Sequence, residues 1–187
     1  RLEMAGGDPD NVLMLNEIPL LDDDGNQMLY PKKKKKTRML GLPDDIAILE
    51  DAINHMNAGL VIVDPLVAYL SPDVKSNSDQ DIRRALSPLS LVAQRTGVSV
   101  ILVSHLNKSG GVDALYRGGG SIGIIGLARV GLLLGRSRTD PTMRVLAGVK
   151  NNIGPMPPSL GFKLESVPGS DVARMDYLGV VPDTATQ

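Results

Sequence analysis

The sequence predicts an α/β fold in which a mostly parallel sheet is flanked by helices and carries antiparallel strands at its C-terminal edge. Apolar segments of strand character alternate with longer segments of helical periodicity. Residues 60–63, Leu-Val-Ile-Val, form a continuous, β-branched-rich run that is typical of a parallel strand buried on both faces. The last strand-like segments follow one another through short connections, which favours antiparallel pairing.

Two helices are expected within the first half of the chain. The first begins after residues 42–45, Leu-Pro-Asp-Asp, because proline suits a first helical turn and acids favour the positive end of the helix dipole. Its apolar positions recur at helical spacing: Ile46, Leu49, Ile53 and Met56. The second runs from about residue 78 to residue 95 and ends before Gly97, and Pro88 inside it removes one backbone hydrogen bond.

Further segments have strand character, namely residues 12–15, 98–103, 130–134, 144–149, 160–164 and 175–179. A short apolar segment, residues 122–128, follows a glycine-rich stretch and is expected to open a helix. We expect the core domain to cover residues 1–165, and residues 166–187 to form an edge strand and a polar tail.

Composition narrows the classes of function. A chain of 187 residues can hold one domain with a sizeable core. No apolar run approaches the roughly 20 residues that span a bilayer, and there is no cysteine, so we expect no membrane partner, no thiolate metal site and a cytoplasmic location. The net charge of −1 gives no overall attraction to nucleic acid, and the aromatic content of 3% argues against modules that stack bases on aromatic platforms.

Asp64 is the first candidate site residue, because it follows the predicted strand of residues 60–63 directly. Ligands of open parallel sheets bind beyond the carboxyl ends of the strands. An acid at that place can hold a hydrated Mg²⁺, although an Asp that only caps the next turn is an equal alternative.

Ser104 and His105 follow the next predicted strand and are expected at the same edge of the sheet as Asp64. There the imidazole of His105 could sense a phosphate or a bound strand through its ring nitrogens. The other histidine, His55, falls on a predicted helix and is interpreted as a structural residue.

The glycine-rich stretch of residues 107–120 is a candidate binding site for the phosphate backbone of a nucleic acid. Glycine allows close approach and cations neutralise phosphate charge. The alternative is a surface loop with solvated cations. Residues 118–123 also match two short motifs, which we reject. The dinucleotide fingerprint G-x-G-x-x-G must follow a strand directly, and here it follows a polar loop. The hydrolase elbow G-x-S-x-G needs a histidine after its serine, and both histidines of the chain precede Ser121. The residues expected to contact a nucleic-acid strand are Lys108, Arg117, Gly119 and Ser121.

Two further cationic features, Lys150 and a run of five lysines, each have a functional and a structural interpretation. Lys150 ends a predicted strand, where it could stabilise phosphoryl-transfer charge in a neighbouring subunit or be an ordinary strand-end lysine. A run of five lysines is more often a solvated loop than a nucleic-acid patch, and three nearby acids partly cancel its charge; it comprises Lys32, Lys33, Lys34, Lys35 and Lys36.

The order of these motifs resembles the RepA-like branch of the RecA and DnaB superfamily of P-loop ATPases, which includes hexameric replicative helicases. The resemblance covers roughly residues 1–165 and implies a RecA-like sheet. It implies that Asp64 is the Walker B acid, that Ser104 belongs to the nucleotide site and that His105 couples nucleotide to the DNA-binding loop. It also implies that Lys150 reaches toward the γ-phosphate of the adjacent subunit.

The resemblance implies ATP and Mg²⁺ as cofactors, single-stranded DNA as a partner and self-association into a ring hexamer. The sequence contains no G-x-x-x-x-G-K-[ST], so the phosphate loop is expected before Arg1, and this chain alone is expected to be inactive. Asn152 stands where ring helicases often carry an arginine finger. Two alternatives therefore stay open: an ATPase of recombination, repair or plasmid regulation without helicase activity, and a catalytically inert module for oligomerisation or DNA binding.

Overall fold

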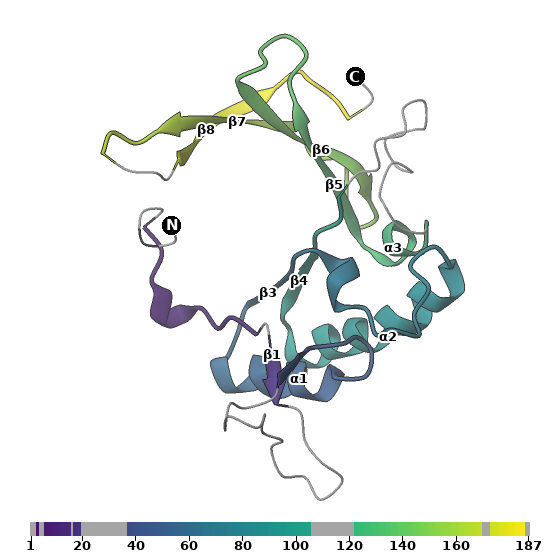
Figure 1. Ribbon diagram of the computed structural model, residues 1–187. Helices are drawn as coiled ribbons and strands as arrows, with labels where there is room; N and C mark the ends of the chain where they lie inside the picture. The colour runs from purple at the N-terminus through teal and green to yellow at the C-terminus, as the bar shows by residue number, and fades with distance from the viewer. Residues whose placement is uncertain are drawn as a thin grey trace, which may run out of the picture. The chain divides into compact units, whose positions relative to one another are not determined.

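The computed structural model describes residues 3, 6–15, 17–19, 37–105, 122–169 and 173–185 (Figure 1). The chain divides into two compact units. The N-terminal unit is Asp10–Ser104, and the C-terminal unit comprises His105–Gln187 together with Arg1–Pro9. Both helices and strands occur, with parallel and antiparallel pairing, which is compatible with the predicted α/β class, and the RecA-like sheet stays a prediction. Among the described helices, none has the length and apolar character needed to cross a membrane.

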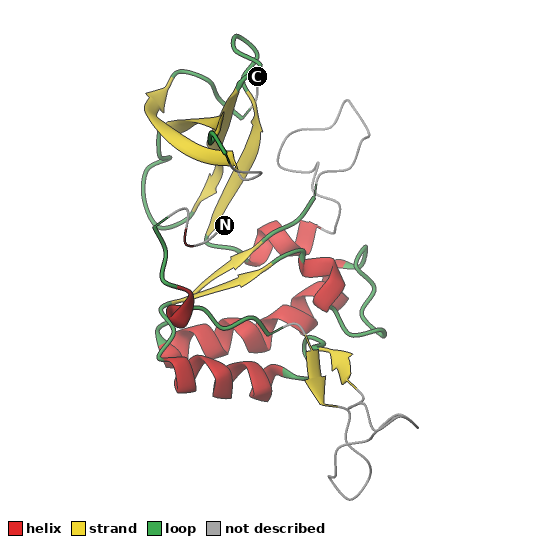
Figure 2. Cartoon of the chain, turned by 60° about the vertical axis from the view of Figure 1, so that its left-hand side comes forward, coloured by secondary structure: helices red, strands yellow, loops and turns green. Residues whose placement is uncertain are grey.

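The N-terminal unit packs two helices against a pair of parallel strands. The helices are α1 (Ile46–Met56) and α2 (Asp79–Thr96), and the strands are β3 (Leu60–Val63) and β4 (Ser99–Leu102). Figure 2 shows the two helices side by side on the same side of the strand pair. A short 3-10 helix, η3 (Leu66–Tyr69), follows β3. Two short strands, β1 (Glu17–Pro19) and β2 (Thr37–Met39), form a separate antiparallel pair, and η2 spans Pro9–Asn11.

The ends of α2 confirm the predicted helix. The Ser78 hydroxyl accepts a hydrogen bond from Asp81 N at 3.3 Å, and Gly97 ends the helix with a φ of 74°. The helix continues through Pro88 and buries one apolar face. Its buried residues are Ile82, Ala85, Leu86, Leu89 and Val92.

The β3–β4 pair is parallel, as predicted, with Leu60 opposite Ser99 and Val63 opposite Leu102. The expectation that β3 is buried on both faces is wrong for the described residues. Val63 is 7% exposed, whereas Ile62, which points to the other face, is 60% exposed. The reason is that α1 and α2 cover one face of this two-stranded sheet and no described element of the unit covers the other.

The C-terminal unit is built on a four-stranded antiparallel sheet with the order β5-β6-β7-β8. Its strands are β5 (Val130–Arg136), β6 (Met143–Asn151), β7 (Ser159–Ser166) and β8 (Ala173–Val181), and α3 (Ile122–Leu127) precedes them. The predicted antiparallel strands are confirmed, but they form a sheet of their own rather than the edge of a parallel one. Among the described residues, parallel pairing occurs between β3 and β4 and at one isolated bridge between Leu42 and Leu70. The short hairpin connections that follow β5 reverse the chain and give antiparallel pairing.

The strand predicted at residues 12–15 is wrong, and the predicted domain boundary is not tested by the structure. Residues 12–15 are not a strand in the structure, because no described strand pairs with them, and Val12, Leu13 and Met14 are 50%, 51% and 75% exposed. The division of the chain after residue 165 stays a prediction.

An ion pair between the exposed Arg38 and the buried Asp45 joins β2 to the start of α1. Asp45 is 5% exposed, and its carboxylate accepts hydrogen bonds from both Arg38 Nη atoms, at 2.5 and 2.6 Å, and from Gly41 N at 2.7 Å. The bond from Arg38 is the main reason why the pKa of the Asp45 carboxyl lies below its ordinary value.

We expect Asp45→Asn to lower the free energy of unfolding at pH 7 by about 1–3 kcal/mol, because it removes the charged acceptor and leaves the donors of Arg38 and Gly41 poorly paired. A carboxyl whose pKa is lowered by folding stabilises the protein above its ordinary pKa of about 3.9 and loses that contribution as the pH falls through the folded value. The difference between wild type and variant should therefore shrink below about pH 4. Urea unfolding at both pH values measures this, with Asp51→Asn on the exposed side of α1 as the control. Equal stability of wild type and Asp45→Asn at pH 7 would contradict the role of this pair.

Gly161 lies where β7 meets β8, and a Cβ atom there would come within 2.6 Å of Val181 Cγ1 and 3.3 Å of Met143 Sδ. We expect Gly161→Ala to destabilise the C-terminal sheet by about 1–3 kcal/mol, since two packed side chains would have to move. Gly135→Ala is the matched control, because a Cβ at Gly135 meets nothing within 4 Å. Chemical denaturation of both variants tests the prediction, which fails if the two lose the same stability.

Candidate nucleotide site at the carboxyl ends of β3 and β4

Asp64 follows β3 and is exposed, although the residues around it are buried. Val63 is 7% exposed and Leu66, the first residue of η3, is 0% exposed. Val103 N donates to Val63 O at 2.9 Å, and Leu66 N donates to Val103 O at 2.8 Å. The backbone on both sides of Asp64 is therefore fixed to the end of β4, while its carboxylate faces solvent.

The chain before α1 is bonded to the end of η3 and the residues that follow it. Leu42 N donates to Tyr69 O at 2.6 Å, and Ser71 N donates to Leu42 O at 2.8 Å. Leu42 is 0% exposed. The sequence does not reveal these bonds, because backbone groups make them, and the one side chain that marks their place is the buried Leu42.

Ser104 lies at the same edge as Asp64, as predicted, since the two residues directly follow Val63 and Val103, whose backbones are bonded. Ser104 is half-buried. His105 is exposed and is the first residue after Ser104 in the C-terminal unit. Its role in coupling nucleotide to a DNA-binding loop stays a prediction.

The Asp64 carboxylate has no hydrogen-bond or ion-pair partner among the described residues. No cluster of three or more potential metal ligands occurs in that part of the chain. A lone accessible carboxylate fits Mg²⁺, which keeps several waters and takes one or two carboxylates together with substrate phosphates. The donor set does not fit a transition metal, which favours imidazole or thiolate ligands.

Lys150 lies near the end of β6, as predicted, and its ammonium caps α3. Lys150 Nζ donates to Ile125 O at 2.7 Å and to Gly126 O at 3.1 Å, two carbonyl oxygens of the last helical turn. These carbonyls have no partner within the helix, and a cation there also interacts favourably with the helix dipole. The structure thus gives Lys150 a structural contact, and its action on a neighbouring subunit stays a prediction.

The other predicted contacts lie outside the described residues. They are Lys108, Arg117, Gly119 and Ser121 of the glycine-rich stretch, and the lysines of residues 32–36.

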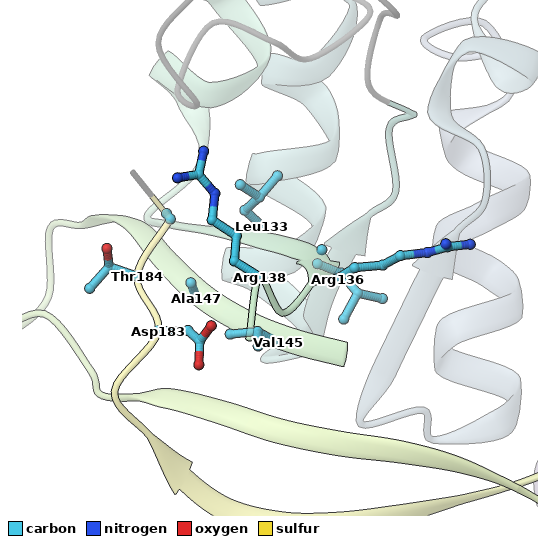
Figure 3. A pocket seen from close by; sticks show the side chains of 10 residues that line it. Leu133, Arg136, Arg138, Val145, Ala147, Asp183 and Thr184 are labelled. Atoms are coloured by element: carbon cyan, nitrogen blue, oxygen red, sulfur yellow. The ribbon is translucent and has the colours of Figure 1, made fainter. Parts of the chain in front are cut away.

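A pocket in the C-terminal unit is lined by none of the predicted site residues. Its lining includes Leu133, Val145 and Ala147 of the sheet and Asp183 and Thr184 of the C-terminal segment. Figure 3 shows Arg136 and Arg138 at this pocket pointing away from one another. The Asp183 carboxylate accepts a hydrogen bond from Ser137 Oγ at 2.9 Å. The polar groups do not converge on one point, so the pocket is a poor candidate for catalysis.

Comparison with known proteins identifies the family but not a close relative. A family model described as an AAA domain matches residues 2–111, a range that contains Asp64, Ser104 and His105 but not Lys150. No curated protein matches the chain. The match covers more than half of the 187 residues. This chain therefore belongs to the AAA domain family, within the P-loop ATPase superfamily.

Proposed function

We propose that this chain carries the metal-binding half of the nucleotide site of a RecA-like, DNA-acting ATPase of the RepA-like helicase type. The observation that supports it most is the exposed Asp64 carboxylate, without a partner among the described residues, at the carboxyl edge of a parallel strand pair inside the range matched by the AAA domain. In this proposal Asp64 holds the Mg²⁺ of Mg²⁺·ATP through water, and Ser104 lines the same edge. Bound Mg²⁺ would neutralise charge that develops on the phosphates.

The part of the proposal that concerns binding of single-stranded DNA is supported by the sequence motifs and the family resemblance. Lys108, Arg117, Gly119 and Ser121 contact single-stranded DNA in the centre of a ring hexamer, and His105 connects this loop to the nucleotide. The sequence contains no G-x-x-x-x-G-K-[ST], the motif that cradles the nucleotide phosphates. Hydrolysis is therefore tested in a protein that combines this chain with a phosphate loop.

A second candidate is an ATPase of recombination, repair or plasmid regulation that does not unwind DNA. It is favoured by Asn152, which is exposed and bonded through its backbone N–H to Arg129 O at 3.0 Å, in the place of an arginine finger. A strand-displacement assay separates the two. Hydrolysis stimulated by single strands without displacement of a duplex would exclude the helicase, and loss of both would favour an inert module.

We expect Asp64→Asn to reduce ATP hydrolysis by about two orders of magnitude or more, because an amide binds Mg²⁺ more weakly than a carboxylate does. Thermal unfolding should be nearly unchanged, since the carboxylate has no partner among the described residues. Asp73→Asn, an exposed acid after η3, is the matched control and should hydrolyse ATP at the wild-type rate. Wild-type turnover in Asp64→Asn would remove this residue from the site.

Lys150→Met tests whether this lysine has a role beyond capping α3. Loss of the cap should lower the free energy of unfolding by about 1–2 kcal/mol and speed amide exchange in α3, because two carbonyl oxygens lose their donor. If Lys150 also acts on a neighbouring subunit, mixing Lys150→Met with Asp64→Asn subunits should restore part of the hydrolysis. No restoration, with faster exchange in α3, would leave Lys150 with the structural role alone. Lys75→Met, an exposed lysine before α2, is the control.

A further inference from the structure

The antiparallel sheet of the C-terminal unit has two chemically different faces. Directly opposed residues of neighbouring strands project to the same face, so the register assigns each side chain. One face, which we name the apolar face, combines nine apolar side chains with two arginines at its centre. These central residues are Leu132, Leu134, Leu146, Leu160, Phe162, Leu164, Met175, Tyr177, Val180, Arg136 and Arg144, and Val130, Asn151, Ser166 and Ala173 lie at the ends of the same face.

Much of the apolar face is open to solvent. Six of its side chains are between 46% and 65% exposed, among them Tyr177 at 60% and Val180 at 65%. Continuous exposed apolar areas of more than a few hundred Å² are rare on proteins that work alone, and they mark binding surfaces.

One row across the four strands brings cations and aromatic rings together. Arg136 is opposite Arg144, Arg144 is opposite Phe162, and Phe162 is opposite Tyr177. The rings of Phe162 and Tyr177 are in contact, with centroids 5.5 Å apart and planes inclined by 48°. Phe162 is the one phenylalanine of the chain.

The charges of the two faces differ in their pairing. On the opposite face Lys163 pairs with Glu165 at 2.8 Å, and Arg174 pairs with Asp176 at 2.6 Å. On the apolar face no carboxylate occurs among the described strand residues. Arg144 Nη1 donates to Pro141 O and Met143 O, and Arg136 has no acceptor in the described part of the chain. The row therefore offers unneutralised positive charge beside the exposed ring of Tyr177 and the half-buried ring of Phe162.

We propose that the apolar face binds single-stranded nucleic acid across this row. Bases stack on Tyr177 and Phe162, and Arg136 and Arg144 face the phosphates. Sheets of four strands that stack bases on exposed aromatic side chains are a recurrent design, and arginine adds both charge and a planar surface. The aliphatic neighbours provide apolar contact beside the stacked bases. This inference rests on the proposed function and adds to it a second contact with single-stranded nucleic acid, separate from the glycine-rich stretch.

A second copy of the chain fits the same face less well. Packing two apolar faces together would bury Arg136 and Arg144 against a surface with no described carboxylate to receive them. A buried charge without a partner costs several kcal/mol. Phosphate groups supply that partner, so the charges favour nucleic acid.

The experiment is a titration of the full chain with fluorescein-labelled oligo(dT) of about 20 nucleotides, longer than a single-fold site, followed by fluorescence anisotropy without ATP. Tyr177→Ala should weaken binding about 10-fold, Tyr177→Leu nearly as much, and Tyr177→Phe little, because stacking needs a ring. Arg136→Ala should reduce the slope of log affinity against log salt by about one. Lys163→Ala on the opposite face is the matched cation control and should leave that slope unchanged.

Tyr177→Leu keeps an apolar side chain, so it separates stacking from simple apolar contact even if Tyr177→Ala fails to fold. Absence of oligo(dT) binding, or equal binding by wild type, Tyr177→Leu and Arg136→Ala, would overturn the proposal. So would self-association that Tyr177→Ala abolishes while oligo(dT) does not bind. The titration needs no hydrolysis, so a failure of the ATPase proposal would show in Asp64→Asn and not here. Arg117→Ala reports on the glycine-rich stretch in the same assay.

Discussion

The backbone bonds that extend the parallel ladder beyond β3 and β4 are the constraint on which the candidate nucleotide site depends. Val103 N bonds to Val63 O, and Val103 O accepts from Leu66 N, so the chain is tied on both sides of Asp64. Val63 and Leu66 are buried, which anchors these ties in the packed side of the strand pair. A carboxylate on such a fixed turn needs little reorganisation to receive a metal ion, whereas one on a free loop would lose more conformational entropy on binding.

Local signals in the sequence predicted the elements whose ends are set by single residues. Gly97 ends α2 with a left-handed φ, and the continuous apolar run of residues 60–63 became β3 with the predicted bounds. The parallel pairing of β3 and β4 followed from the helix between them, because a helical crossover returns the chain in the same direction. The hairpin connections likewise predicted antiparallel pairing for the later strands.

Features that depend on a partner distant in sequence could not be predicted in the same way. Residues 12–15 have the composition of a strand, but a strand exists only where another strand pairs with it, and composition does not supply one. The open face of β3 depends on which side α1 and α2 cover, a tertiary property. Lys150 looked like a strand-end cation, and only the packing of α3 beside β6 shows that two helix carbonyls bind it.

The position of the aromatic row likewise depends on a feature that composition does not contain. A content of 3% aromatic residues argued against a base-stacking surface, and it was a sound argument about averages. Stacking needs only a few rings, provided that they are adjacent and exposed. The extra residue in β8, Leu178, shifts the register between Gly161 and Phe162, so that Phe162 lies opposite Tyr177. Without that bulge Phe162 would lie opposite Leu178, and Tyr177 would project to the face that carries the paired charges. A single inserted residue therefore decides which face of the sheet combines rings and arginines, and no count of residue types contains that information.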